Sequence, residues 1–166
     1  KRSRKVASQL SSGISHLLKK NNVQVFEGFG SLVKNTSNIK KIRIKTKDNN
    51  IEKTAKNVIL ATGARSKNLP FVSSDGINIW DYKTAMTPPK LPSSLIIVGS
   101  GAIGMEFASF YNDLGVDVTI VEALPSILPN EDIDISNIVK LNFEKRGIKI
   151  KTNSTLKSVT NKKNSV

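Results

Sequence analysis

Hydrophobic residues near the start of the chain recur every three or four positions, which is the spacing of one face of an α-helix. The residues that follow this spacing are Val6, Leu10, Ile14, Leu17 and Leu18. Two consecutive asparagines, Asn21 and Asn22, then interrupt the pattern. We therefore predict an amphipathic helix over about residues 3–20.

The pattern then changes to short runs of β-forming residues. Strands are expected over residues 23–26, 31–33 and 39–46, and Asp48, Asn49 and Asn50 form a turn signal after them. Residues 58–61 are a continuous apolar run, which is typical of a buried strand, and this run stops at Thr62 and Gly63. This part of the chain is predicted to hold a small β-meander and one buried strand.

From residue 95 onward, apolar runs alternate with helical patterns. We expect strands at residues 95–98, 116–121 and 148–151, and helices at residues 103–114 and 134–146. Gly115 and Gly147 follow the two helices directly, where a helix commonly ends. Strand–helix–strand–helix–strand predicts an α/β fold with a Rossmann-like, doubly wound parallel sheet.

A proline-rich stretch separates these two patterns. Residues 87–92 contain three prolines, which remove backbone donors and fix φ, so this stretch cannot form a regular helix or a central strand. We predict a linker there, with one domain at residues 1–88 and a second at residues 94–166.

The net charge of +13 suggests a nucleic-acid-binding surface, so its distribution matters. Residues 1–90 hold 18 lysines and arginines against 5 acidic residues, whereas residues 91–166 hold 8 of each. The excess consists of dispersed lysines with few of the aromatic residues that base stacking uses. We predict a solvated basic surface and no nucleic-acid binding. The alternative is a non-catalytic basic module whose binding to nucleic acid or an acidic partner weakens with salt.

Cysteine is absent, and His16 is the single histidine. These counts exclude disulfides, thiolate metal sites and cysteine chemistry by this chain alone, and we expect no metal site. No apolar run approaches the ~20 residues that span a bilayer, so no membrane association is expected. Because residue 1 is Lys and not Met, we expect the chain to be a piece of a longer protein.

The hexapeptide from Gly99 to Gly104 fits the pattern G-x-G-x-x-G, and it lies between a predicted strand and a predicted helix. Glycine permits the tight turn at the first position, close approach of a pyrophosphate at the second and close helix packing at the third. The helix N-terminus offers free N–H groups to phosphates. The residues of this candidate site are Gly99, Ser100, Gly101, Ala102, Ile103 and Gly104.

Glu122 ends the second strand of this unit, about twenty residues past the glycines, where a carboxylate accepts hydrogen bonds from the adenosine ribose. A 2′-phosphate there would meet a like charge. Residues 91–139 contain seven acidic residues and no lysine or arginine, which favours NAD over NADP. Glu106, one turn into the first helix, either faces the cleft or lies on the helix surface.

The order of these motifs resembles the pyridine nucleotide-disulfide oxidoreductases over almost the whole chain. The segment NVILATGARSKNLP is similar to the family's Ala-Thr-Gly segment beside the flavin. The segment LIIVGSGAIGMEFASFYNDLGVDVTIVEALPSILPNEDID is similar to its NAD domain, with Gly-x-Glu after the fingerprint and Leu-Pro-x-x-Asp after the second strand. Among its members, those that oxidise dihydrolipoamide are most similar. The resemblance implies part of an FAD-binding domain, with the β-meander, joined to an NAD domain.

The resemblance implies cofactor roles for matching positions only. For FAD, these are a backbone contact of Gly30 to the adenine and a lining formed by Thr62, Gly63 and Ala64. For NAD, Met105 and Glu106 extend the glycine loop, with Glu106 near the nicotinamide and flavin. Glu122 binds the adenosine ribose, and Leu156 lies near the adenine.

The family's reaction also needs a first FAD fingerprint, a redox cysteine pair and a His–Glu pair on a dimerisation domain, and none of these is in this sequence. We therefore expect no catalytic residue here, an inactive chain that binds FAD weakly or not at all, and an NAD sheet that lacks its later strands. The resemblance implies a homodimeric parent that oxidises dihydrolipoamide on the lipoyl domain of an acyltransferase, within a 2-oxo acid dehydrogenase complex. The compartment is either bacterial cytoplasm or mitochondrial matrix.

Other members of the same family stay open as alternatives. Mercuric reductase, glutathione reductase and transhydrogenase types share these motifs. Glu122 argues against those that use NADPH, but the substrate is decided by residues outside this chain.

Overall fold

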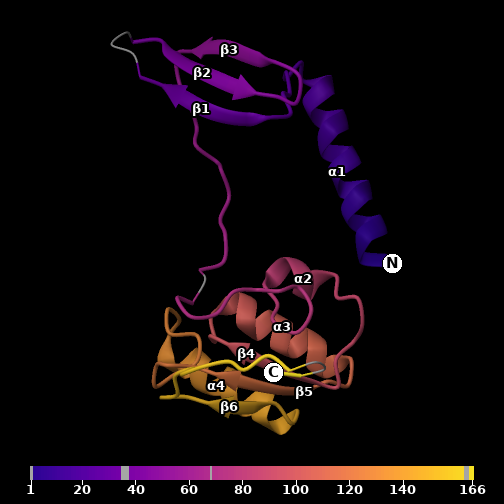
Figure 1. Ribbon diagram of the computed structural model, residues 1–166, viewed down its shortest axis with the longest axis vertical. Helices are drawn as coiled ribbons and strands as arrows, with labels where there is room; N and C mark the ends of the chain where they lie inside the picture. Colours follow the sequence, from indigo (N-terminus) through magenta and orange to yellow (C-terminus); the bar gives the residue numbers. More distant parts are fainter. Residues whose placement is uncertain (1, 35–37, 68, 163–164) are drawn as a thin grey trace. The chain divides into compact units, whose positions relative to one another are not determined.

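The computed structural model describes residues 2–34, 38–67, 69–162 and 165–166 (Figure 1). It divides into two compact units, Lys1–Gly63 and Ala64–Val166. Trp80 and Ala85 pack within the second unit: the Tyr111 hydroxyl donates to the Ala85 carbonyl at 2.6 Å, and the ring of Trp80 lies 6.2 Å from that of Tyr111. The domain division predicted at residues 88–94 remains a prediction.

The first unit begins with helix α1 (Arg2–Lys20), at the predicted position. The helix ends where Asn22 adopts a positive φ of 56° and the N–H of Val23 donates to the Leu18 carbonyl. Lys19 and Lys20 lie in the last turn, where cations interact favourably with the helix dipole. The predicted apolar stripe is present, but all of its large side chains at Val6, Leu10, Ile14 and Leu17 are exposed.

The predicted β-meander is an antiparallel sheet in the order β1 (Phe29–Val33), β2 (Lys40–Lys45) and β3 (Asn50–Ala55). The turn between β2 and β3 is closed by Thr46, whose N–H and hydroxyl both donate to the Asn49 carbonyl. β3 was not among the predicted strands because its sequence is mostly polar and lacks a clear alternation of apolar and polar residues. Its full register with β2, from Lys40↔Ala55 to Lys45↔Asn50, supplies the hydrogen bonds that make it a strand.

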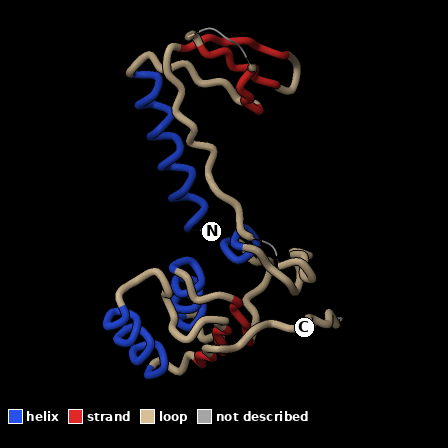
Figure 2. The backbone as a smooth tube through the Cα atoms, turned by 90° about the vertical axis from the view of Figure 1, so that its left-hand side faces the viewer, coloured by secondary structure: helices blue, strands red, loops and turns tan. Residues whose placement is uncertain are grey.

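Two predicted strands are wrong. Residues 23–26 and 58–61 form no strand and are drawn as loop in Figure 2. Neither segment pairs with another strand in the part of the chain that the structure describes, and Ile59 is 91% exposed. An extended apolar segment becomes a strand only when a neighbour accepts and donates its backbone hydrogen bonds.

The second unit contains the predicted parallel sheet, in the order β4 (Ser94–Val98), β5 (Asp117–Val121) and β6 (Lys149–Lys151). Helix α3 (Ala102–Asp113) connects β4 to β5, and α4 (Ile133–Lys145) connects β5 to β6. A short helix that the pattern did not predict, α2 (Tyr82–Met86), precedes them and is capped by the Asp81 carboxylate. The strands and helices predicted for residues 95–151 are therefore confirmed, with small shifts at their ends.

The core of this unit lies between helices α3 and α4 and one face of the sheet. Val118 and Ile120 of the central strand β5 are fully buried, and Ala108 and Tyr111 of α3 are buried against the same cluster. Leu95 and Ile97 of β4 and Val139 and Phe143 of α4 pack around it. Because side chains alternate along a strand, Ile96 and Val98 point to the other face and stay exposed. Among the described helices, none is long and apolar enough to cross a bilayer.

Candidate dinucleotide-binding site

The glycine turn joins the end of β4 to the start of α3, and its three glycines have different surroundings. Gly99 has a φ of +97°, a conformation that favours glycine, and its N–H donates to the Val121 carbonyl. A Cβ at Gly104 would collide with the Gly99 carbonyl oxygen, whereas a Cβ at Gly101 would meet no atom within 4 Å. Gly99 and Gly104 are therefore required by the fold, and Gly101 leaves open space on the side where a ligand can approach.

The N-terminus of α3 has free donors at this open space. Gly101 is the N-cap residue, and among the described residues no side chain caps the helix. The first N–H groups of an α-helix have no partner within the helix, and they carry the positive end of its dipole. Ala102 and Ile103 are exposed in this first turn, so their backbone can reach a phosphate.

The carboxylate of Glu122 is buried directly beside this turn, with 7% of the residue exposed. Its Oε2 accepts from the Ser100 N–H at 2.8 Å and from the Ser100 hydroxyl at 2.6 Å. Its Oε1 accepts from the Leu124 N–H at 2.9 Å. The structure thus brings together two residues 22 positions apart that the sequence assigned separately to the site.

These hydrogen bonds keep Glu122 ionised. Desolvation by burial raises the pKa of Glu122, but the hydrogen bonds from Ser100, Leu124 and Ala123 together lower it by more, so that the pKa lies below its usual value. A carboxylate that stays charged at neutral pH is a strong acceptor for hydroxyl groups and repels a phosphate.

The loop between β5 and α4 closes one side of the site, and sequence reasoning did not assign its residues. The Leu128 N–H donates to the Ser100 carbonyl at 3.0 Å, and Leu128 adopts a positive φ of 47°. The Ser136 hydroxyl donates back to the Leu128 carbonyl. The Leu-Pro-x-x-Asp pattern marked this loop, but its contact with the glycine turn depends on the fold.

The remaining predicted NAD positions lie in different surroundings. Glu106 is exposed on α3, next to Ile103, which is 65% exposed. The side chain of Met105 is buried in the core, and its N–H donates to the Gly101 carbonyl. Leu156 is partly buried in the segment after β6. Their assignment to NAD remains a prediction.

The residues predicted to contact FAD all lie in exposed backbone. Gly30 is exposed within β1, where it pairs with Ile44. Thr62, Gly63 and Ala64 are exposed in an irregular segment, and Gly63 has a φ of +74°. The assignment of these residues to FAD also remains a prediction.

Comparison with known proteins agrees with this geometry. Residues 1–166 match the family described as pyridine nucleotide-disulphide oxidoreductase. The chain belongs to this family. This membership confirms the resemblance found in the sequence, and with it the expected fold of a parallel α/β sheet joined to an antiparallel meander.

Among the family's curated members, the dihydrolipoyl dehydrogenase of Zymomonas mobilis is 49% identical over 159 residues, which cover 96% of this chain and 34% of that protein. The dihydrolipoyl dehydrogenase of Rhizobium etli is 43% identical over 169 residues, covering 95% of this chain and 35% of that protein. The chain therefore spans about a third of the length of these relatives.

Two solved structures are also similar to nearly the whole of this chain, which again covers about a third of each of them. LpdA from Mycobacterium tuberculosis superposes with a TM-score of 0.87 at 34% identity, covering 96% of this chain and 35% of that one. The HOCl-induced flavoprotein disulfide reductase RclA of Escherichia coli, as a Cu(II) complex of a cysteine-to-serine mutant, gives a TM-score of 0.84 at 28% identity, covering 98% and 36%.

Proposed function

We propose that this chain contains the NAD-binding part of a flavin-dependent dihydrolipoyl dehydrogenase. The observation that carries the proposal is the buried, ionised Glu122 beside a glycine turn that is open at Gly101. The name of the relatives at 49% and 43% identity supports the enzyme class.

The proposed binding uses three groups of this chain. The free N–H groups at the start of α3 bind the pyrophosphate, and the open space at Gly101 allows its close approach. The Glu122 carboxylate accepts a hydrogen bond from the adenosine ribose. A 2′-phosphate would place a second negative charge against a carboxylate that is already desolvated, so NAD is preferred over NADP.

The activity of the whole enzyme depends on groups that this chain does not supply. Gly30, Thr62, Gly63 and Ala64 would hold FAD, which would supply electron transfer between a dithiol and NAD⁺. Cysteine is absent from this sequence, so we derive no flavin step from this chain. The chain alone is proposed to be inactive in dihydrolipoamide oxidation.

The setting of the parent is part of the same proposal. We propose a homodimer that acts on dihydrolipoamide carried by the lipoyl domain of an acyltransferase, in bacterial cytoplasm or mitochondrial matrix. A second candidate is a flavoprotein disulfide reductase with another substrate, which the structural similarity to RclA supports.

The test is a titration of this chain with NADH and, separately, with NADPH, followed by nucleotide fluorescence. Tighter binding of NADH is expected, with the preference lost or reversed in Glu122→Ala. Glu144→Ala is the matched control because Glu144 is an exposed carboxylate on α4. Folded chains, checked by circular dichroism, that bind neither nucleotide or prefer NADPH would overturn the proposal.

A further inference from the structure

Ser100 occupies a position where the G-x-G-x-x-G pattern specifies no residue type, yet its side chain is fully buried. Its hydroxyl and its N–H donate to the same oxygen of Glu122, at 2.6 Å and 2.8 Å. Its carbonyl accepts from the N–H of Leu128. All of its polar groups are thus used within the protein, and its hydroxyl is directed at the carboxylate and away from solvent.

The acceptor sites of the Glu122 carboxylate show what this contact does. An ionised carboxylate has about four lone-pair positions, two on each oxygen. Ser100 takes both positions on Oε2, the Leu124 N–H takes one on Oε1, and the Ala123 N–H also interacts with the carboxylate. Because Oε2 is saturated by Ser100, a ligand hydroxyl that bonds to this carboxylate does so at Oε1. The Ser100 hydroxyl therefore determines which oxygen is available, and it holds the side chain in one orientation.

We infer that Ser100 is a positioning residue for nucleotide recognition: it saturates Oε2 of Glu122, so that the adenosine ribose is bound through Oε1. The inference rests on the proposed NAD binding and specifies how the ribose is bound. An O–H···O⁻ hydrogen bond is charge-assisted and short, which makes it effective in fixing the orientation of a carboxylate. Alanine at this position would leave only the backbone N–H on Oε2.

The experiment uses two probes, ADP and 2′,3′-dideoxy-ADP, which share adenine and diphosphate and differ only in the ribose hydroxyls. Binding is measured by calorimetry for the wild-type chain, Ser100→Ala, Glu122→Gln and the double variant. We expect the wild type to prefer ADP. Ser100→Ala should weaken ADP binding about 3- to 10-fold and leave dideoxy-ADP binding unchanged. In the Glu122→Gln background, Ser100→Ala should have little further effect.

A purely structural role of Ser100 predicts a different result. Both probes would then weaken by the same factor, or the effect of Ser100→Ala would persist in the Glu122→Gln background, and either outcome overturns the inference. Unchanged ADP binding in folded Ser100→Ala overturns it as well. If Ser100→Ala does not fold, judged by circular dichroism, Ser100→Gly carries the same comparison.

The proposed function and this inference fail in different ways. Wild-type chain that binds neither NADH nor ADP overturns the function and, with it, the inference. Wild-type chain that prefers NADH, and ADP over dideoxy-ADP, while Ser100→Ala keeps both preferences, overturns the inference alone.

Discussion

The two compact units bury their apolar side chains to very different extents. In Ala64–Val166, a closed cluster includes Tyr111, Val118 and Ile120, each with no exposed surface. In Lys1–Gly63, none of the described residues is buried, although α1 and the meander carry apolar stripes. A β–α–β unit covers its own strands with its crossover helices, whereas a helix and a three-stranded meander of this size leave faces open. Hydrophobic patterning predicts a face, but does not guarantee that the same chain covers it.

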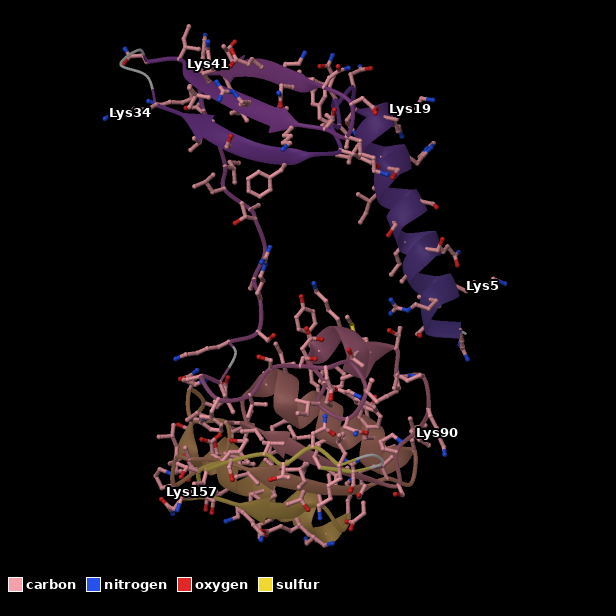
Figure 3. All side chains as sticks on the ribbon, viewed as in Figure 1. Lys5, Lys19, Lys34, Lys41, Lys90 and Lys157 are labelled. Atoms are coloured by element: carbon pink, nitrogen blue, oxygen red, sulfur yellow. The ribbon has the colours of Figure 1, made fainter. Side chains whose placement is uncertain are left out.

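The two units also differ in net charge. Lys1–Gly63 contains 14 lysines and arginines against 3 acidic residues, whereas Ala64–Val166 contains 12 against 10. Figure 3 shows Lys5 and Lys19 extending outward from α1. Both acidic oxygens of Glu52 are paired, with Lys41 and Arg43, on the exposed meander. The dispersed lysines fit the predicted solvated surface.

The largest expected effect on stability comes from a substitution in the core of the second unit, and a matched substitution in the first unit should not share it. Tyr111→Ala removes a fully buried ring and its hydrogen bond to Ala85, so we expect a loss of about 3–5 kcal/mol in the free energy of unfolding. Urea denaturation, followed by the fluorescence of the single tryptophan, Trp80, measures it. Ile14→Ala is the control because Ile14 is exposed on α1, and the Trp80 transition should not move. Equal shifts for both variants would contradict the separation of the units.

A second pair of variants separates folding from binding within the glycine turn. Gly104→Ala places a Cβ against the Gly99 carbonyl and should lower the free energy of unfolding by about 1–3 kcal/mol. Gly101→Ala places a Cβ in open space, so stability should stay unchanged while NADH affinity falls. Urea denaturation and NADH titration of both variants check this. Unimpaired NADH binding by Gly101→Ala would show that no ligand approaches there.

The pH dependence of stability should carry a contribution from Glu122. Because its pKa is lower in the folded chain than the ordinary value of 4.5, the stabilisation is present above that value and is lost as the pH falls through the folded pKa. Glu122→Gln should lower the free energy of unfolding by about 1–2 kcal/mol at neutral pH and flatten the decline below pH 4.5. Urea denaturation at several pH values, monitored through Trp80, measures both effects.

Glu52→Gln is the control for the pH dependence of stability. Hydrogen bonding and charge from Lys41, followed by Arg43, lower the pKa of Glu52, but Glu52 lies on the exposed meander of the first unit. Its replacement should leave the acid limb of the Trp80 transition unchanged. An identical acid limb for wild type and Glu122→Gln would refute the assigned role of the carboxylate.

The smallest effect is expected for exposed ion pairs in either unit. Lys149 contacts Asp117 at 2.9 Å between β6 and β5, and Lys41 contacts Glu52 at 3.1 Å between β2 and β3. Solvent screens both pairs, so Lys149→Ala and Lys41→Ala should each change local stability by less than about 1 kcal/mol. Hydrogen exchange of the strand amides measures the change. A larger effect in the meander would indicate that ion pairs stabilise the unit that lacks a buried core.

The sequence alone determined the features that depend on neighbouring residues. Helical spacing, the glycines after each helix and the fingerprint predicted α1, α3, α4 and the glycine turn, since these depend on local backbone preferences and short-range hydrogen bonds. The site residues of the turn and Glu122 were predicted in the same way, from the requirements of a tight turn and from spacing.

Only the tertiary structure decided which distant groups meet. Residues 58–61 have the sequence of a buried strand but no partner strand among the described residues, and Ala85 joins the core of the second unit through its hydrogen bond with Tyr111. The pairing of the Ser100 hydroxyl with Glu122, and the closure of the turn by Leu128, cross 22 or more positions of the chain. Strand pairing, burial and the orientation of a carboxylate all depend on what the rest of the fold places nearby, and no local pattern contains that information.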